Sequence, residues 1–426
     1  MNTDGKIPFC KPSTISAWKR GLEALKPSPA QLQHGLESHQ NLFVMDGFAF
    51  LPVGIWDDEL IKQWNDLKDS FVGARELSKR MEQARETAMT RNVDSANEFV
   101  AAVRGTGLKC MVQTVAEGKS RQEDIFRMSN NFQVLRTFRN TLVQAGSVEE
   151  IAEANAAGKV AVVWSINGPP LAGELQELDQ ELSWIDTWYY LGVRLMHMTY
   201  NRRNLVGDGC AEDTNAGLSA LGKDLIAKLN QTGIIVDTSH SGRQTTLEAA
   251  KYSSKPMMAS HTAACGVFDY MRCKTDPELK AIADTDGLVG VYGLANMLGH
   301  NATINTMLDH IDYIARLIGV EHVSIGTDNM YQSGWPEGVR GYPKARFTGN
   351  TWWGNWTRPG GRPVPSSDES SAGSLAWTNW PLYTVGLVMR GYSDDDIAKI
   401  MGQNFLRVLK ANEPERMVHN ADLAIH

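Results

Sequence analysis

The chain has 426 residues, of which 42% are hydrophobic and 21% are charged, and its formal net charge is −7. This composition is typical of a folded globular protein and excludes global disorder. Nucleic-acid-binding proteins normally carry a basic excess, so the negative charge argues against that class. No apolar run is long enough to span a bilayer, and we expect no membrane partner.

The first 25 residues contain no apolar stretch after a basic start, so we expect no signal peptide. The five cysteines are scattered, odd in number and without a CxxC pair. A disulfide framework is therefore not expected, and a reducing compartment is the simplest location. The sequence predicts a cytoplasmic protein.

Short apolar runs alternate with longer amphipathic stretches along most of the chain. Eight runs read as strands: 42–45, 108–112, 160–164, 193–198, 234–236, 256–259, 288–292 and 323–325. Helical spacing of apolar residues marks segments such as 218–229 and 304–317. Strand–helix alternation predicts parallel strands joined by helical crossovers, and eight units closing on themselves make a (β/α)8 TIM barrel. A doubly wound open sheet is the alternative.

Three segments lie outside this eightfold pattern: the N-terminal residues, a long charged helical stretch at 60–100, and an irregular region at 330–378. Residues 1–41 form an N-terminal extension, the barrel with C-terminal helices near 380–411 occupies 42–411, and 412–426 form a tail. Within the barrel, 330–378 is an irregular insertion rich in Gly, Pro and Trp; its tryptophans are Trp335, Trp352, Trp353, Trp356 and Trp377. Tryptophans need burial, so this insertion is predicted to be either a structural flap or a substrate-facing lid.

Polar residues follow three of the predicted strands. His240 follows the fifth strand, His261 the sixth, and Asp328 the eighth. In a TIM barrel the active site lies at the C-terminal ends of the strands, and imidazole and carboxylate are ordinary zinc ligands. These three residues are therefore candidate metal ligands.

Several stretches of the chain resemble the membrane dipeptidase family (renal dipeptidase, peptidase M19) of the amidohydrolase superfamily. The most specific are GLSALGKDLIAKLNQTGIIVDTSHSG, which ends at Gly242, and HTAACGVFDYMR, which covers His261–Arg272. The resemblance covers roughly residues 44–409. It implies an amidohydrolase-type (β/α)8 barrel that hydrolyses dipeptides with two bridged zinc ions, usually as a homodimer.

The resemblance also implies that this chain has lost part of that metal site. The His and Asp that bind the first zinc in the family correspond to Phe48 and Phe50, and the bridging glutamate corresponds to Asn167. A substrate-contacting His corresponds to Tyr200. The second zinc's ligands, His240 and His261, are retained, as are Asp328 and the substrate-carboxylate arginine, Arg272.

A two-metal site needs anionic bridges, so we expect at most one ion, or none. The ligands of this ion would be His240, His261 and Asp328. Zinc suits this set, and so does iron, because two His and a carboxylate also form non-haem iron sites. Alternatively, the third ligand comes from the loop that contains Cys210, Glu212 and Asp213. The simpler interpretation of this loop is that it is acidic and solvated.

The sequence also predicts roles around this ion. If Asp328 is not a ligand, it is a candidate general base. Tyr200 is a candidate hydrogen-bond donor to an oxyanion, or a proton carrier if its pKa falls. Arg272 would bind the substrate carboxylate, beside a pocket lined by Asn167, Phe48 and Phe50. Strand alternation is expected to turn His197 to the opposite face, and Asp237 is expected to be structural.

The first functional hypothesis is a dipeptidase-like, metal-dependent hydrolase acting on a small amide or peptide-like substrate that carries a carboxylate. The alternatives are a non-hydrolytic enzyme on the same barrel (a lyase, decarboxylase, isomerase or non-haem metal oxidoreductase) and a non-catalytic binding or partner subunit. The expected partners are a small molecule and a second copy of the chain, since symmetric dimers are the commonest assembly.

Overall fold

Eight parallel strands pair side by side in the order β1-β2-β4-β5-β6-β7-β8-β9, and a short ninth strand, β3, pairs with β4 off this path. The computed structural model describes residues 12–51, 55–70, 74–118, 120–171, 178–331 and 365–414. The strands are β1 (Met45–Ala49), β2 (Cys110–Ala116), β3 (Leu142–Gln144), β4 (Val160–Ile166), β5 (Val193–His197), β6 (Ile235–Asp237), β7 (Met258–Thr262), β8 (Leu288–Val291) and β9 (Val323–Ile325).

The first and last strands meet just beyond β9. The Asp328 amide donates to the Phe48 carbonyl at 2.8 Å, and the Phe50 amide donates to the Asn329 carbonyl at 3.1 Å. These bonds close the sheet into a barrel, so the (β/α)8 prediction is confirmed and the open-sheet alternative is wrong. All eight predicted strands are present, and the short strand β3 is an addition that was not predicted.

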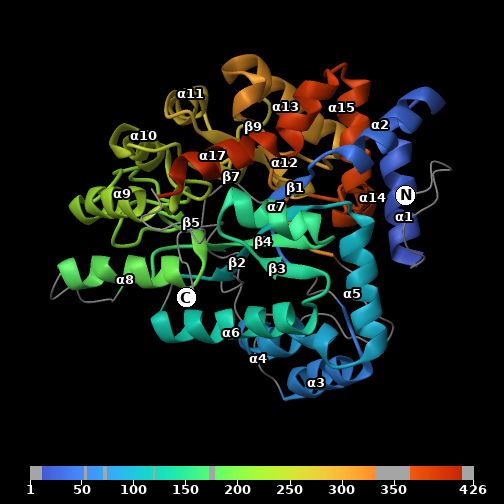
Figure 1. Ribbon diagram of the computed structural model, residues 1–426, viewed down its shortest axis with the longest axis horizontal. Helices are drawn as coiled ribbons and strands as arrows, with labels where there is room; N and C mark the ends of the chain where they lie inside the picture. Colours follow the sequence, from blue (N-terminus) through green and yellow to red (C-terminus); the bar gives the residue numbers. More distant parts are fainter. Residues whose placement is uncertain are drawn as a thin grey trace, which may run out of the picture.

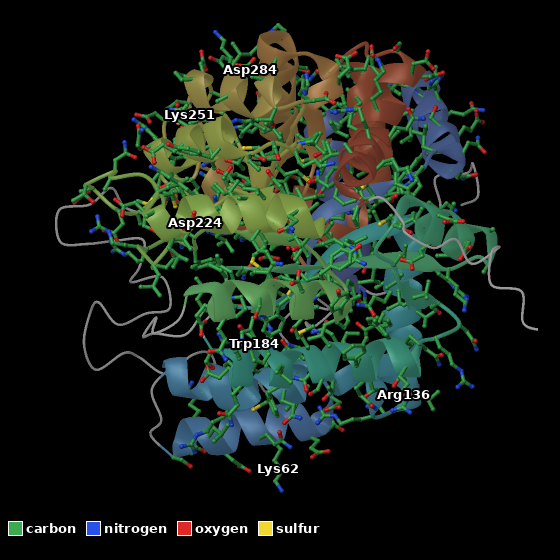
Figure 2. The ribbon with its side chains drawn as sticks, turned by 60° about the vertical axis from the view of Figure 1, so that its left-hand side comes forward. Lys62, Arg136, Trp184, Asp224, Lys251 and Asp284 are labelled. Carbon is green, nitrogen blue, oxygen red and sulfur yellow. The ribbon has the colours of Figure 1, made fainter. Side chains whose placement is uncertain are left out.

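Helices surround the barrel on its outside (Figure 1). They are α1 (Pro12–Leu25), α2 (Pro29–Asn41), α3 (Asp58–Asp69), α4 (Ala74–Glu86), α5 (Val93–Gly105), α6 (Arg121–Thr137), α7 (Val148–Ala156), α8 (Leu178–Tyr190), α9 (Ala220–Thr232), α10 (Arg243–Tyr252), α11 (Asp276–Asp284), α12 (Ala295–Leu298), α13 (Ile304–Ile318), α14 (Glu369–Ser374), α15 (Trp380–Met389), α16 (Asp394–Ala398) and α17 (Asn404–Asn412). Their outer faces carry charged side chains, labelled in Figure 2: Lys62, Arg136, Asp224, Lys251 and Asp284.

Local sequence signals set several helix ends. Ser28 and Gln31 form a capping box in front of α2, with Pro29 in its first turn, and Thr275 and Glu278 do the same for α11. Each box satisfies two backbone amides that the helix itself leaves unpaired. Gly233 ends α9 with a left-handed φ of 95°, a conformation that glycine adopts without strain. These signals explain where α2 and α11 begin and where α9 ends, so that the chain can turn toward β6.

The interior of the barrel is filled by alternate residues of the strands. One buried cluster joins Met45, Cys110, Val112, Ala161, Val163, Leu195, Ile235, Met258 and Leu288 to Phe405, Val408 and Leu409 of α17. Because Met45 and Cys110 begin their strands, α17 packs against the N-terminal end of the barrel. Within the described residues, the strand ends that carry His240 and His261 lie at the opposite end.

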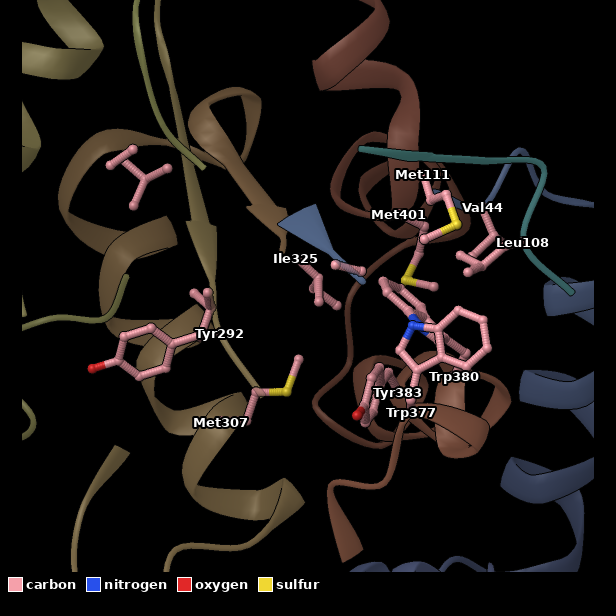
Figure 3. Packing of buried hydrophobic residues seen from close by; sticks show 14 of the residues in the cluster. Val44, Leu108, Met111, Tyr292, Met307, Ile325, Trp377, Trp380, Tyr383 and Met401 are labelled. Carbon is pink, nitrogen blue, oxygen red and sulfur yellow. The ribbon is translucent and has the colours of Figure 1, made fainter. Parts of the chain in front are cut away.

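Extra helices at both chain ends pack together against the barrel. α1 and α2 contact α14 and α15, and in Figure 1 they lie side by side. Figure 3 shows Trp377, Trp380 and Tyr383 close to Val44, Leu108 and Met401. Of the Trp-rich insertion, Trp377 is buried here, whereas Trp335, Trp352, Trp353 and Trp356 lie outside the described residues. None of the helices described is both long and apolar enough to cross a membrane.

Candidate active site

Two histidines from neighbouring strands face each other at the C-terminal end of the barrel. His240 lies three residues after β6 and His261 lies within β7; their Nε2 atoms are 2.8 Å apart. His240 Nδ1 lies 2.7 Å from Asn201 Oδ1, and an amide oxygen only accepts. His240 therefore carries its proton on Nδ1, so that His261 Nε2 donates to His240 Nε2.

The remaining nitrogen of this pair is also engaged. His261 Nδ1 lies 2.9 Å from Ser260 Oγ, which is its donor when Nε2 carries the proton. Both imidazoles are buried, and burial, with the nearby Arg272 charge, lowers the pKa of His240 and of His261 well below the usual value. Both rings are therefore neutral, the form in which imidazole accepts a proton or binds a metal.

Arg272 lies beside the histidine pair and is almost fully buried. Its NH2 group is 3.3 Å from His240 Nε2 and 3.3 Å from the His261 carbonyl. Its NH1 group donates to the Ser239 carbonyl. Backbone carbonyls thus fix the guanidinium at the strand ends, where the resemblance places a carboxylate-binding arginine.

Two phenylalanines form one wall of the site. Phe48 stacks on His261, with ring centroids 4.0 Å apart and an interplanar angle of 22°, and Phe50 meets Phe48 edge to face at 5.9 Å. Phe48 is 1% exposed. An apolar side chain therefore fills the place where the resemblance expects a metal ligand.

The structure contradicts the prediction that His197 turns to the opposite face. Its ring centroid lies 5.3 Å from Phe48, 5.3 Å from His261 and 5.4 Å from His240. The prediction counted alternation back from Tyr200, but β5 ends at His197, so the counted residues do not belong to the strand. Three imidazoles therefore cluster here, and two of them, those of His197 and His261, contact Phe48.

Asp237 is the neighbour of His197 on the next strand, with which it is in register. Its Oδ2 lies 3.1 Å from His197 Nε2, and its Oδ1 accepts from the Ser239 amide and hydroxyl. Burial alone would raise the pKa of Asp237, but His197 and the hydrogen bonds hold it below the usual value. This carboxylate ties the ends of β5, β6 and β7 together.

Asp328 is held at the site by an unusual backbone conformation. Its φ is 52°, in the left-handed region that non-glycine residues adopt only at a cost. The preceding residue, Thr327, is clamped by Asp46, which accepts from the Thr327 amide at 2.8 Å and the Thr327 hydroxyl at 2.6 Å. Burial raises the pKa of Asp328 to about 7; Arg272 and His197 oppose the rise and Glu117 adds to it.

Tyr200 covers the other side of His240. The two rings stack with centroids 4.3 Å apart at 25°. Burial, and then the charges of Glu117 and Asp328, raise the pKa of Tyr200 well above the usual value. The condition for a proton carrier, a lowered pKa, is therefore not met, and the phenol can act as a hydrogen-bond donor.

Asn167 follows β4 and contacts a carboxylate that the sequence analysis missed. Its Nδ2 donates to Glu117 Oε2 at 3.2 Å, and its Oδ1 accepts from Thr114 Oγ1 at 3.2 Å. The strand was predicted to end at residue 112, whereas β2 continues to Ala116. An acidic residue directly after the true strand end was the available signal for Glu117.

The acidic loop after β5 is largely engaged in its own contacts. Asp208 pairs with Arg203 at 2.5 Å and accepts from the Thr214 hydroxyl and the Ala216 amide. Glu212 lies 3.8 Å from Arg202. Cys210 Sγ lies 3.5 Å from Asn201 Oδ1, the atom that also contacts His240. Of this loop, Cys210 is the candidate ligand that lies near the histidine pair.

The donor chemistry suits one metal ion better than two. Phe48 and Phe50 carry no donor atom, and Asn167 is a neutral amide already bonded to Thr114 and Glu117. In contrast, the Nε2 atoms of two neutral imidazoles face each other at 2.8 Å, and neutral imidazole nitrogen is an ordinary zinc ligand. Among the described residues, no group of three or more His, Cys, Asp or Glu is arranged to hold an ion.

Comparison with known proteins gives one family. Residues 39–345 match the family model "Membrane dipeptidase (Peptidase family M19)". An uncharacterized dipeptidase from Schizosaccharomyces pombe is 31% identical over 232 residues, 53% of this chain and 48% of the relative. The dipeptidase tcpJ from Claviceps purpurea is 23% identical over 66% of this chain and 57% of its own length. The chain thus spans about half the length of the curated relatives it matches.

Solved structures share the fold. An amidohydrolase from Pseudomonas aeruginosa superimposes with a TM-score of 0.62 at 24% identity, covering 89% of this chain and 98% of that one. The probable dipeptidase PvdM from the same organism gives a TM-score of 0.63 at 20% identity, over 90% of this chain and 98% of that chain. These likenesses support the barrel architecture.

Proposed function

Because the chain belongs to the membrane dipeptidase family, we propose that it is a metal-dependent hydrolase of the dipeptidase type. Its substrate is a small amide or peptide-like molecule that carries a carboxylate. Arg272 is the observation that carries this proposal: a buried guanidinium, fixed by two carbonyls, lies 3.3 Å from His240 Nε2. Guanidinium groups recognise carboxylates through paired hydrogen bonds.

The proposed site takes at most one ion, zinc or iron, and His240, His261 and Asp328 are the residues that would hold it. Binding requires Asp328 and the two histidines to move together, because the described residues contain no ready group of three ligands. The facing Nε2 atoms of the two histidines support the first two ligands. A bound ion would supply a Lewis acid that polarises the scissile carbonyl. The retained donor set contains no second group of ligands, since Phe48, Phe50 and Asn167 replace it.

The protein's own side chains then have distinct roles. Alternatively, Asp328 stays unligated and serves as the general base: burial raises its pKa to about 7, and a base works best when its pKa lies near the ambient pH. The Tyr200 hydroxyl donates a hydrogen bond to the developing oxyanion. Phe50, half-buried and packed on the buried ring of Phe48, makes one edge of the site apolar, which favours a more hydrophobic substrate than a short polar dipeptide.

The test is hydrolysis of a panel of dipeptides and acylated amino acids, each with a free or an amidated C-terminal carboxylate. We expect turnover of the free-carboxylate compounds alone. In Arg272→Lys, which keeps the charge but loses the planar fork, KM for these compounds should rise with little change in kcat. Equal turnover of the amidated compounds would contradict the proposal.

A second candidate is a non-catalytic binding subunit. The direct His261–His240 hydrogen bond and the Phe48 stack satisfy both imidazoles from within the protein. Metal analysis after dialysis separates the candidates, because a relic site would hold no ion even with zinc or iron in excess. A homodimer in the cytoplasm remains our proposal for assembly and location, and sedimentation and cell fractionation test it.

A further inference from the structure

The hydroxyl of Ser260, in β7, lies between two possible acceptors. Ser260 Oγ is 2.9 Å from His261 Nδ1 and 3.1 Å from Ser239 Oγ. Both serines are completely buried, so bulk water does not compete for these contacts. A serine hydroxyl carries a single proton. Ser260 can therefore donate to the ring or to the other serine, but not to both at once.

Ser239 is held in one orientation by Asp237. Its hydroxyl donates to Asp237 Oδ1 at 2.7 Å, and the same carboxylate oxygen accepts from the Ser239 amide at 2.9 Å. An ionised carboxylate only accepts, so the Ser239 proton stays in this bond. The Ser239 oxygen is left to accept, from the His261 amide at 3.0 Å and from Ser260. The path from the carboxylate to the imidazole thus contains one hydroxyl that is able to turn.

The imidazole at the end of this path has two neutral tautomers, and only one of them can bind an ion at Nε2. In the ion-free protein His261 Nε2 donates to His240 Nε2, 2.8 Å away, so His261 Nδ1 accepts from Ser260. A metal ion needs the lone pair of Nε2, which places the His261 proton on Nδ1. Nδ1 is then a donor and needs an acceptor. His240 requires no such change, because Asn201 Oδ1 already holds its proton on Nδ1.

We propose that the Ser260 hydroxyl is a two-position donor that gives His261 a hydrogen-bond partner in both tautomers and so allows it to bind an ion. Without an ion, Ser260 donates to His261 Nδ1. With an ion, Ser260 accepts from Nδ1 and donates to Ser239 Oγ. The ring keeps one proton throughout: the Nε2 proton leaves to water, Nδ1 takes one up from water, and neither serine loses its own.

Ser260 and Ser239 are therefore positioning residues for the ion of the proposed function, on which this inference rests. The two positions of the hydroxyl make different demands on Ser239. In the ion-free protein Ser260 donates to the ring, and Ser239 is not its acceptor. In the ion-bound protein Ser239 is the acceptor that Ser260 needs. Removal of the Ser239 hydroxyl should therefore weaken ion binding specifically.

Zinc binding to the full chain, measured by competition with a chelator, tests this assignment in Ser239→Ala. A buried hydroxyl without an acceptor is costly, and the outer partners of metal-binding histidines change metal affinity by about tenfold to a hundredfold. We therefore expect Ser239→Ala to bind zinc at least about tenfold more weakly than the native protein. Undiminished affinity would overturn the assignment while leaving the metal-dependent function in place.

Ser241→Ala is the matched control. Ser241 follows His240 directly, as Ser239 precedes it, and it is also buried. The substitution removes a buried hydrogen bond from the Thr199 hydroxyl, at 3.1 Å, which is not part of the path to His261. Its zinc affinity should match that of the native protein. Equal weakening in both variants would indicate general loosening of this segment and would overturn the assignment.

The tautomers can be observed directly by long-range proton–nitrogen NMR of protein labelled in its histidines, with His261→Gln to identify the signal. The His261 proton should be on Nε2 without zinc and on Nδ1 with zinc. This measurement uses the native protein, so it decides the question if Ser239→Ala fails to fold. A proton on Nδ1 in the ion-free protein would overturn the exchange alone. Absence of any zinc binding would refute both the exchange and the metal-dependent function.

Discussion

Phe48 stacks on His261 with their ring centroids 4.0 Å apart, so an apolar ring from β1 lies against an imidazole that the family resemblance expects to bind metal. The contact buries Phe48 and keeps water from that side of the ring. The number of metal ions that the protein binds is therefore the first property to measure.

We expect purified protein, dialysed after incubation with excess zinc, to retain one equivalent of metal or none. His240→Ala should abolish whatever binding is present, since it removes one of the two facing nitrogens. His34→Ala is the matched control, because His34 pairs with Asp394 on the surface. Two tightly bound equivalents by elemental analysis would contradict the prediction.

Hydrolysis of ordinary dipeptides should be weak. Loss of one ion, its ligands and its bridge removes part of the polarisation of the scissile carbonyl, and each 1.4 kcal/mol of barrier costs about tenfold in rate. Steady-state assays of L-L and L-D dipeptides with added zinc measure this. Turnover of roughly 10–1000 per second, which is ordinary for enzymes in general, would show that the altered set of metal ligands does not slow hydrolysis.

Asp46→Asn should destabilise the protein by about 2–3 kcal/mol, because buried donors that lose their acceptor are costly. Asp46 Oδ2 accepts from the Thr327 hydroxyl at 2.6 Å and from Trp377 Nε1 at 3.1 Å. In asparagine an NH2 group, which cannot accept a hydrogen bond, replaces one of the two carboxylate oxygens. Denaturant unfolding measures the loss. Asp224→Asn, on the exposed face of α9, should change stability by less than about 0.5 kcal/mol.

Stability should fall on acidification through His39. This ring is buried between the Thr106 carbonyl and the Thr384 hydroxyl, each 2.8 Å away, and burial lowers its pKa from 6.5 to about 4. Between these values the unfolded chain binds a proton that the folded chain does not, so acid favours unfolding. The neutral His39 ring contributes about 3 kcal/mol to the free energy of unfolding. This contribution is fully present above pH 6.5 and is lost as the pH falls toward 4.

Urea unfolding at pH 7.5 and pH 4.5 measures this dependence. His39→Gln should be less stable at pH 7.5 but lose less stability on acidification than the native protein. His34→Gln, at an exposed position, should follow the native profile. An unchanged pH dependence in His39→Gln would show that other groups cause the loss.

Local patterns in the sequence determined the family and most of the barrel. Alternation of short apolar runs with helical periodicity located eight strands, because burial of one face imposes that spacing on each segment independently. The strand-end positions of His240, His261 and Asp328 followed from the same pattern. The replacements at Phe48, Phe50 and Asn167 were also visible in the sequence, by resemblance.

Only the tertiary structure decided which of these residues meet. The direction of the His197 side chain depended on where β5 ends. The position of Glu117 beside Asn167 depended on the pairing of β2 with β4 and on the close backbone approach at Gly118. The clamp of Asp46 on Thr327 joins positions 281 residues apart. Such contacts arise from closure of the barrel, and closure depends on strand register and packing over the whole chain, which no local window of sequence contains.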